Sequence, residues 1–172
     1  FVIIDYPDAV DTRCLGINNS GQIVGHYEDV GGAIHGFFYD QGIFTTIDAP
    51  GSLKTIASGI NDKRQIVGTY DDIHGFLYDK GEFQAIDIPE ALETQCWRIN
   101  NHGQIVGTFK GCSGATHGFF YDKALFTILD NTDGPDTTSY GINNRGHIVG
   151  RYSYEGLGHG YLYNKKEFKS FG

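Results

Sequence analysis

The sequence predicts an all-β fold: a four-bladed β-propeller of four-stranded antiparallel blades, with the ring closed by pairing of the N- and C-terminal strands. Three observations support this prediction. A Gly-Ile-Asn type motif occurs four times with a period of about 40 residues, which is typical of propellers and solenoids, whose units cannot bury their apolar faces alone. Some spacings within the repeat are constant while others vary. No window has the apolar period of a helix.

The first half of each repeat predicts a hairpin. In the first copy, residues 15–18 form a short strand that ends at Asn19-Ser20-Gly21, a turn in which Asn and Gly accept positive φ. Residues 22–27 follow and are rich in β-branched side chains, which favour strands. The four copies of this hairpin place Gly16, Gly59, Arg98 and Gly141 at the same position.

The second half of each repeat predicts two more strands. Residues 35–39 of the first copy read His-Gly-Phe-Phe-Tyr, with large apolar groups on both sides, as expected for a strand buried between neighbouring sheets. A turn at residues 40–42 leads to a strand at 44–48, which Pro50 ends. The repeats therefore span approximately 14–50, 57–89, 96–132 and 139–172 of a single domain.

The spacing of the motifs separates a rigid part of the repeat from a variable one. His35 and Ile60 are 25 residues apart, and the equivalent residues of the next two crossovers have the same separation. From the Gly of Ile-Val-Gly to the repeat His, the distance is instead 10, 6, 10 and 9 residues. A constant crossover is expected between rigid blades, and variable loops are where a scaffold tolerates change. We therefore expect the loops between the second and third strands to form the functional face.

A surplus strand precedes the first repeat. Residues 1–7 match residues 44–50, so the chain contains five copies of the fourth strand. We expect this strand to join the last blade and close the ring. The two alternatives are a longer array with more blades and strand addition to another molecule, which would link copies of the chain.

The repeat also resembles a known family. The blocks Gly-Ile-Asn-Asn-x-Gly-Gln-Ile-Val-Gly, His-Gly-Phe-Phe-Tyr and Phe-Thr-Thr-Ile-Asp-x-Pro are similar to the bacterial extracellular repeats called the HAF family, over nearly the whole chain. The resemblance implies an exported, propeller-like repeat protein with no known catalytic residues. Arg64, which replaces a turn Gly, and Arg98, which replaces the Gly before Ile99, depart from the pattern and make the local turn shape uncertain.

The composition limits the partners. The formal net charge is −8, whereas binding to nucleic acid requires a basic surface. No apolar run reaches the roughly 18 residues of a membrane span. The chain starts at Phe1 and contains no Met, which indicates either a processed, exported chain or a segment of a longer one. We favour the exported chain and an extracellular location.

The three cysteines allow one disulfide. Cys14 and Cys96 occupy the same repeat position, and Cys112 lies in the variable loop of the third repeat. If that loop and the start of its inner strand share one end of the blade, Cys96 and Cys112 could be bridged, with Cys14 left free. The alternative is three buried thiols.

Four repeat histidines have the residue type of a metal site. Their position on third strands would spread them around the ring, so we favour a structural network in which each hydrogen-bonds a repeat Asp or a backbone group. The residues are His35, His74, His117 and His159, with Asp5, Asp48, Asp87 and Asp130. The repeat Asn pairs lack the Asp spacing of calcium loops, and we interpret them as turn formers. No resident metal or cofactor is expected.

The variable-loop end supplies the candidate ligand site. Its acidic residues could hold calcium weakly, and nearby aromatic residues could stack on sugar rings; the alternative is a solvated acidic rim. The candidates are Glu28, Asp29, Asp71, Asp72, Trp97, Tyr140 and Tyr154. No catalytic arrangement of Ser, His and Asp or of paired carboxylates is evident. We expect a non-enzymatic module that binds carbohydrate or another protein; the alternatives are a structural subunit linked by strand addition and a polysaccharide-active enzyme.

Overall fold

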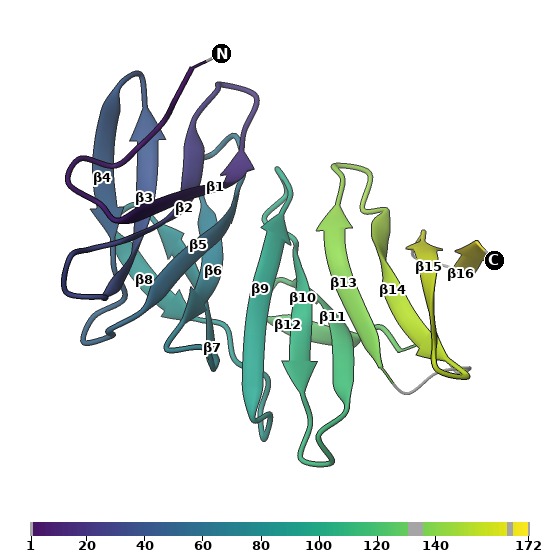
Figure 1. Cartoon of the computed structure of the whole chain (residues 1–172). Coiled ribbons are helices and arrows are strands. Elements are labelled where there is room, and N and C mark those ends of the chain that lie inside the picture. Colours follow the sequence, from purple (N-terminus) through teal and green to yellow (C-terminus); the bar gives the residue numbers. More distant parts are fainter. Residues whose placement is uncertain (1, 131–135, 165–166, 172) are drawn as a thin grey trace.

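The computed structural model describes residues 2–130, 136–164 and 167–171, which form sixteen strands and no helix (Figure 1). Blade 1 contains β1 (Asp11–Ile17), β2 (Ile23–Glu28), β3 (Ile34–Asp40) and β4 (Ile43–Ile47). Blade 2 contains β5 (Thr55–Ile60), β6 (Ile66–Tyr70), β7 (His74–Asp79) and β8 (Glu82–Ala85). Blade 3 contains β9 (Glu93–Ile99), β10 (Ile105–Lys110), β11 (Thr116–Asp122) and β12 (Leu125–Ile128). Blade 4 contains β13 (Thr137–Ile142), β14 (Ile148–Tyr154), β15 (Leu157–Tyr163) and β16 (Phe168–Phe171).

Each blade is a separate four-stranded antiparallel sheet in chain order, which confirms the predicted fold class. The variable loops connect the second and third strands of each blade, at the end where the crossover enters the inner strand. Within the part of the chain that the structure describes, no helix is long and apolar enough to cross a membrane.

The first hairpin of each blade turns on a residue with positive φ. Gly21, Gly103 and Gly146 have φ values of 76°, 79° and 78°, and Arg64 has 64° at the equivalent position of blade 2. This conformation favours Gly because a Cβ is crowded there. Arg64 nevertheless keeps the turn that Gly makes in the other blades, so the local shape is unchanged and a long cationic side chain is added.

Each inner strand carries a β-bulge at the same repeat position. The pairing of β1 with β2 skips Leu15, and the equivalent skipped residues are Ser58 in β5, Trp97 in β9 and Tyr140 in β13. A bulge bends its strand and increases the local twist. The four inner strands are therefore curved alike, and each presents an irregular backbone segment at the same level.

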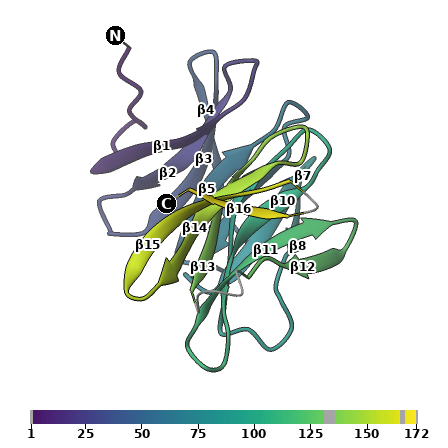
Figure 2. The same ribbon diagram turned by 90° about the vertical axis from the view of Figure 1, so that its right-hand side faces the viewer.

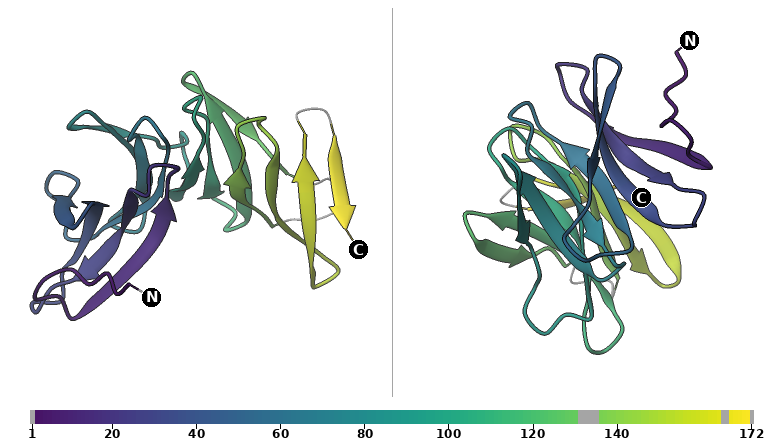
Figure 3. Two further views of the ribbon diagram at one scale, coloured as in Figure 1. Left: turned by 90° about the horizontal axis from the view of Figure 1, so that it is seen from above. Right: turned by 90° about the vertical axis from the view of Figure 1, so that its left-hand side faces the viewer.

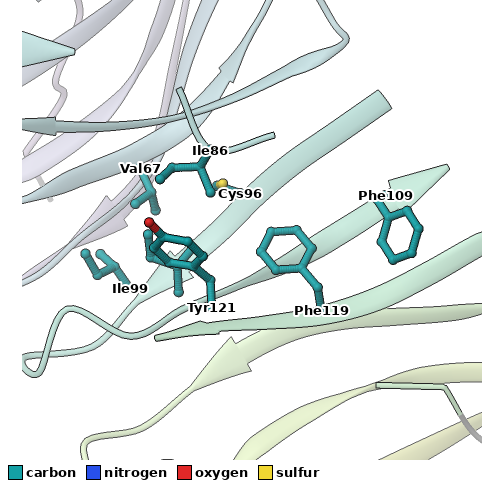
Figure 4. Packing of buried hydrophobic residues seen from close by; sticks show 8 residues of the cluster. Val67, Ile86, Cys96, Ile99, Phe109, Phe119 and Tyr121 are labelled. Carbon is teal, nitrogen blue, oxygen red and sulfur yellow. The ribbon is translucent and has the colours of Figure 1, made fainter. Parts of the chain in front are cut away.

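The hydrophobic core lies between the blades. The cluster between blades 1 and 2 contains Val24, Ile47, Ala57, Ile60, Ile66 and Phe76. Figure 4 shows the equivalent cluster between blades 2 and 3, where Val67 and Ile86 of one blade meet Cys96 and Ile99 of the next. A third cluster joins blades 3 and 4. Each blade therefore depends on its neighbours for burial, as expected of stacked repeats.

Asparagine side chains also join the blades, at the ends of the first hairpins. Asn18 Oδ1 accepts two backbone N–H groups of its own turn, both at 3.0 Å. Its Nδ2 donates to the backbone oxygen of Asn61 in the next blade at 3.1 Å. Asn61 and Asn100 make the same contact with the following Asn100 and Asn143 oxygens, at 2.9 and 3.0 Å. The interpretation as turn formers was thus incomplete, because one side chain holds the turn and links two blades.

The predicted ring closure is not found. The blades follow one another along an open arc with blades 1 and 4 at its ends (Figure 3, left). Residues 2–7 do not join blade 4, whose outer strand in the described structure is β16. Tyr6 instead stacks on Tyr27 of blade 1 with ring centroids 3.6 Å apart, and its hydroxyl lies 2.8 Å from Thr46 Oγ1. Aromatic stacking on its own blade thus holds the segment beside β1 (Figure 2).

The N-terminal segment still has the geometry of a crossover. Tyr6 N donates to Thr12 Oγ1 at 3.0 Å, as Ala49 N donates to Thr55 Oγ1 at 3.1 Å where the chain passes from blade 1 to blade 2. The sequence match between the two segments therefore extends to their contacts, although Phe1 of the predicted strand lies outside the described residues. Residues 5–7 occupy the place on blade 1 that a preceding blade's crossover occupies elsewhere.

The predicted disulfide is not formed. Cys96 is fully buried between blades 2 and 3, and burial raises the pKa of its thiol. Cys112 is exposed in the variable loop and donates to the backbone oxygen of Glu90 at 3.2 Å. Because Cys96 pairs with Gly107 within the sheet while Cys112 lies beyond its end, the two thiols do not meet. Cys14 is exposed and free, so the alternative of three buried thiols is also wrong.

Candidate functional site

The acidic residues of the variable loops are held by their own surroundings. Asp29 Oδ1 accepts two backbone N–H groups of its loop at 2.8 and 2.9 Å. Asp71 accepts the N–H of Leu53 at 3.1 Å, and Asp72 forms an ion pair with Lys54 at 2.6 Å. Across the described ranges, no three His, Cys, Asp or Glu side chains lie close enough to hold one metal ion. This geometry gives the weak calcium option no support.

The aromatic candidates do not form one surface. Tyr154 ends β14 at the variable-loop end, as Glu28 ends β2. Trp97 and Tyr140 occupy the bulge position of adjacent inner strands, in the half nearer the first hairpin turn. The prediction that they lie near the variable loops was therefore wrong, because the bulge is several residues away from that end. Trp97 Nε1 donates to Thr108 Oγ1 at 3.0 Å, whereas Tyr140 is half-exposed.

Arg98 connects the bulges of three blades. Its guanidinium donates to the backbone oxygens of Trp97 at 2.7 Å, Ser58 at 2.8 Å and Leu15 at 3.3 Å. These oxygens belong to the equivalent position of blades 3, 2 and 1, so the carbonyls of the inner strands converge on one side chain. Partial burial lowers the pKa of Arg98. The residue that replaces a repeat Gly thus supplies a tethered cation where backbone acceptors gather.

Three of the four repeat histidines hydrogen-bond a repeat aspartate. Histidine Nδ1 lies 2.7, 2.9 and 2.9 Å from aspartate Oδ2 in the pairs His35–Asp48, His74–Asp87 and His117–Asp130. These pairs occur one per blade and do not gather at one site. His159, in β15 of blade 4, has no such partner within the described residues: Asp5 precedes Tyr6, which stacks on blade 1, and His159 Nε2 is buried without a hydrogen bond.

The pair in blade 1 has a second carboxylate. Asp29 Oδ2 lies 3.5 Å from His35 Nε2, on the other side of the ring from Asp48. Burial alone would lower the pKa of His35, but the hydrogen bonds and charges of Asp48 and Asp29 outweigh it and raise the pKa. The Tyr27 ring also stacks on the imidazole at 5.0 Å. The site therefore favours protonated His35, which contacts one oxygen of each carboxylate. The other oxygen of Asp48, Oδ1, is buried without a hydrogen-bond partner among the described residues.

A groove between blades 1 and 2 has free polar groups over an apolar floor. Its volume is about 220 Å³, and its lining comprises Phe38, Thr45, Ile47, Arg64, Ile66, Tyr78, Lys80 and Gly81. The Arg64 guanidinium lies 5.9 Å above the Phe38 ring and 3.3 Å from Asp40 Oδ2. Lys80 forms no ion pair and the Tyr78 hydroxyl no hydrogen bond within the described residues. Donors from both blades are thus available around one hollow.

The same groove recurs at the other blade interfaces with different chemistry. Between blades 3 and 4 a hollow of about 230 Å³ is lined, among the described residues, by Gln104, Phe120, Asp122, Thr127, Ile148 and Tyr163. Between blades 2 and 3, Gln84 takes the place of Thr45 and lies 3.5 Å from the Tyr121 hydroxyl. Tyr121 is only 8% exposed there, so this side chain partly fills the groove. A hollow of about 370 Å³ on blade 2 is lined by Leu77, Asp79, Lys80, Glu82, Phe83 and Gln84, so its one lysine is accompanied by two carboxylates. Among the described linings, the groove beside Arg64 has two cationic side chains over an apolar floor.

Sequence reasoning did not find this groove. The sequence pattern identifies Arg64 as a departure from a turn Gly and predicts a strand at residues 35–39, which includes Phe38, and neither feature indicates a groove. One signal was present: Arg64 is the long cationic residue at a position that is Gly in the other three copies. Its reach across the blade boundary to Asp40 depends on how the blades stack, which the repeat pattern alone does not specify.

Comparison with known proteins supports the fold alone. No protein-family model and no curated protein matches the sequence. The β-propeller domain of the Trilobed protease from Pyrococcus furiosus, described as having an open velcro topology, is similar with a TM-score of 0.62 and 14% identity over 92% of this chain and 53% of that one. Pyrococcus horikoshii acylaminoacyl peptidase gives a TM-score of 0.64 and 15% identity over 94% of this chain and 27% of that one.

A lectin shares the fold as well. Aleuria aurantia lectin in complex with Fucα1-6GlcNAc gives a TM-score of 0.52 and 12% identity, over 94% of this chain and 62% of the lectin. The chain thus spans less than two thirds of the length of each of these proteins. The similarity extends along nearly the whole arc and establishes that its four sheets are propeller blades.

Proposed function

We propose that this chain is a non-enzymatic carbohydrate-binding propeller module, which holds a single sugar ring in the groove between blades 1 and 2. The main observation behind this proposal is the lining of that groove, where Arg64, Lys80, Tyr78 and Thr45 surround an apolar floor. A volume of about 220 Å³ is below that of pockets for drug-sized ligands. It suits one ring rather than an extended chain.

The chemistry of the groove matches that of a sugar. A pyranose has an apolar face, which packs on aromatic rings such as Phe38 and Tyr78, and hydroxyls, which accept hydrogen bonds from guanidinium and ammonium groups. Arg64 uses one carboxylate contact, to Asp40 at 3.3 Å, and its side chain is 64% exposed. Its remaining N–H groups are therefore available to a ligand.

Two further points support this assignment. A lectin that carries Fucα1-6GlcNAc shares the fold, although that likeness by itself concerns the fold. The resemblance of the repeats to HAF-family proteins supports an exported chain at the cell exterior, where glycans are accessible. We therefore extend the proposal to an extracellular module of HAF type.

The experiment uses a glycan array that includes Fucα1-6GlcNAc, followed by titration calorimetry of any sugar bound. Arg64→Gly is the sharpest variant, because Gly occupies this turn in the other blades and the positive φ of Arg64 suits it. We expect this change to reduce affinity at least tenfold, as expected for loss of a charged hydrogen-bond donor. Arg145→Ala removes one arginine from the corresponding hairpin turn of blade 4 and should leave affinity unchanged.

Two results would overturn the proposal. One is an array without signal for the folded chain. The other is a bound sugar whose affinity is equal in the wild-type and Arg64→Gly chains. If Trp97→Ala or Tyr140→Ala abolished binding while Arg64→Gly did not, the inner strands would be the binding site instead.

A further inference from the structure

The two ends of the arc have unpartnered faces that belong to the same repeating interface. Inside the arc, Val24 and Val67 are fully buried against the following blade, whereas their equivalent Val149 in blade 4 is 50% exposed. Likewise, Ile60 is 7% exposed where it receives the preceding blade, whereas its equivalent Ile17 in blade 1 is 66% exposed. We call the face of blade 4 that carries Val149 the donor face and the face of blade 1 that carries Ile17 the receiving face. Neither face is covered by another blade in the described structure.

The receiving face of blade 1 contains an apolar hollow. Its volume is about 240 Å³, and it is lined by Cys14, Leu15, Gly16, Ile17 and Ile23. In the cluster between blades 1 and 2, Val24 packs with Ala57, Ile60 and Ile66, which are the blade 2 equivalents of Cys14, Ile17 and Ile23. The hollow is therefore the place that the valine of a preceding blade fills elsewhere in the arc. Val149 is the valine left exposed at the other end.

The hydrogen bonds of the two faces are complementary as well. Within the arc, each repeat Asn Nδ2 donates to the next blade's Asn backbone oxygen. Asn143, the last of the series, is exposed and its Nδ2 has no partner in the described structure. Asn18, the first of the series, keeps a backbone oxygen that no preceding blade uses. A donor at one end and an acceptor at the other thus continue the same ladder.

A second set of bonds follows the same direction. The backbone N–H of Asn19 donates to Asp62 Oδ1, that of Asp62 to Asn101 Oδ1, and that of Asn101 to Asn144 Oδ1, each at 2.9 Å. The N–H of Asn144 has no following blade to bond, and Oδ1 of Asn19 has no preceding one. The blade 4 end therefore has a hydrogen-bond donor, Asn144 N–H, and the blade 1 end has an acceptor, Asn19 Oδ1. Each lacks the partner that a neighbouring blade provides inside the arc.

The inner strand of blade 4 also permits close approach. A Cβ at Gly59 would lie 2.9 Å from the Trp97 oxygen of the following blade, so Gly suits this position where β5 and β9 meet, although blade 3 has Arg98 there. The equivalent Gly141 faces only a methyl group of Val149. Blade 4 therefore has the small residue that blades 1 and 2 use at this contact, with no blade beyond it in the described structure.

We propose that blade 4 of one copy of this chain docks on blade 1 of a second copy, head to tail, with Val149 in the hollow of blade 1 and Asn143 bonded to the Asn18 oxygen. Such an interface is heterologous: it closes into a ring if the rotation fits and otherwise extends into a filament. Two copies supply eight blades, a number at which propellers close. This contact uses the blade faces rather than strand addition, and it is independent of sugar binding.

The experiment measures the mass of the purified 172-residue chain by sedimentation velocity at physiological salt, because a net charge of −8 on each copy opposes association at low salt. Concentrations run from about 1 µM to about 1 mM, which spans weak and moderate affinities. Ile17→Lys spoils only the receiving face and Val149→Lys only the donor face. Both side chains are exposed in the single chain, so the fold is retained; Leu125→Lys, 72% exposed in blade 3, is the matched control.

We expect the wild-type chain and the Leu125→Lys control to associate with concentration, and each face variant alone to remain monomeric. An equimolar mixture of Ile17→Lys and Val149→Lys retains one intact donor face and one intact receiving face. The mixture should therefore form a 1:1 dimer that grows no further. The proposal is overturned if the wild type is monomeric throughout, if either variant alone still associates to the same extent, or if mixing fails to restore the dimer.

Discussion

Replacing Tyr161 by Phe tests how a buried hydroxyl pair stabilises blade 4. Tyr161 is 2% exposed and Ser139 is fully buried, with their oxygens 2.7 Å apart. Burial raises the pKa of Tyr161 to about 12, so the phenol is neutral at pH 7. Blade 2 has Phe76 and Ala57 at the equivalent positions, and an apolar pair therefore fits the same packing.

The magnitude follows from burial. Tyr161→Phe removes the hydrogen bond and leaves the Ser139 hydroxyl buried without a partner, which costs about 1–3 kcal/mol. Ser139→Ala strands the Tyr161 hydroxyl at a similar cost. The double variant reproduces the apolar pair of blade 2. Its loss in free energy of unfolding should therefore be smaller than the sum of the two single-variant losses by about 1–3 kcal/mol.

The assay is urea denaturation of the wild type, the two single variants and the double variant. The slope of the free energy of unfolding against urea concentration should be the same for all four, which checks two-state behaviour. Tyr163→Phe, which changes a half-buried tyrosine of the same strand, is the control and should cost less than Tyr161→Phe. Additive losses in the double variant, within about 0.5 kcal/mol, would refute the coupling.

The remaining predictions also concern stability. Arg98→Gly, which restores the repeat residue, should lower the free energy of unfolding by about 1–3 kcal/mol because carbonyls of three blades lose a charged donor; an unchanged urea midpoint would contradict this. Asn61→Ala should destabilise the chain more than Asn143→Ala in the same assay, since only Asn61 bonds a following blade; equal losses would argue against the ladder. Asp48→Asn should lower the free energy of unfolding most below about pH 6.5, the ordinary pKa of His, and less as pH rises through the raised folded-state pKa of His35. The reason is that a raised pKa means that protonation of His35 stabilises the fold. A difference between variant and wild type that does not depend on pH would exclude the ion pair.

The His–Asp pairs show what the repeat could predict. His35 lies in β3, and Asp48, 13 residues later, directly follows β4 of the same hairpin, so the turn between the strands sets their register. The pairing is therefore a local property that recurs wherever the two residues recur. The repeat predicted Asp5 as the partner of His159, and this failed because the two residues lie in different blades at opposite ends of the arc.

The candidate site shows the limit of the same reasoning. Asp29, Asp71 and Asp72 lie in variable loops as expected, whereas Glu28 ends β2. Whether Asp29 and Asp72 are free depends on contacts with their own loop and with Lys54. Arg64 was visible as a departure from the repeat, yet its position over Phe38 requires the stacking of blade 2 on blade 1. Side chains that meet across blades come from segments whose relative placement no local pattern specifies.

By itself the sequence determined the blade: four strands, their turns, the constant crossover and the single variable loop, because these depend on local backbone preferences repeated four times. Tertiary structure alone decided how blades combine. Stacking of Tyr6 on blade 1 held the surplus strand away from blade 4, and the arc remained open. Burial between sheets made Cys96 inaccessible to Cys112 and left Ile17 and Val149 exposed at the two ends. These outcomes depend on non-local packing, in which each face is buried only if another blade reaches it.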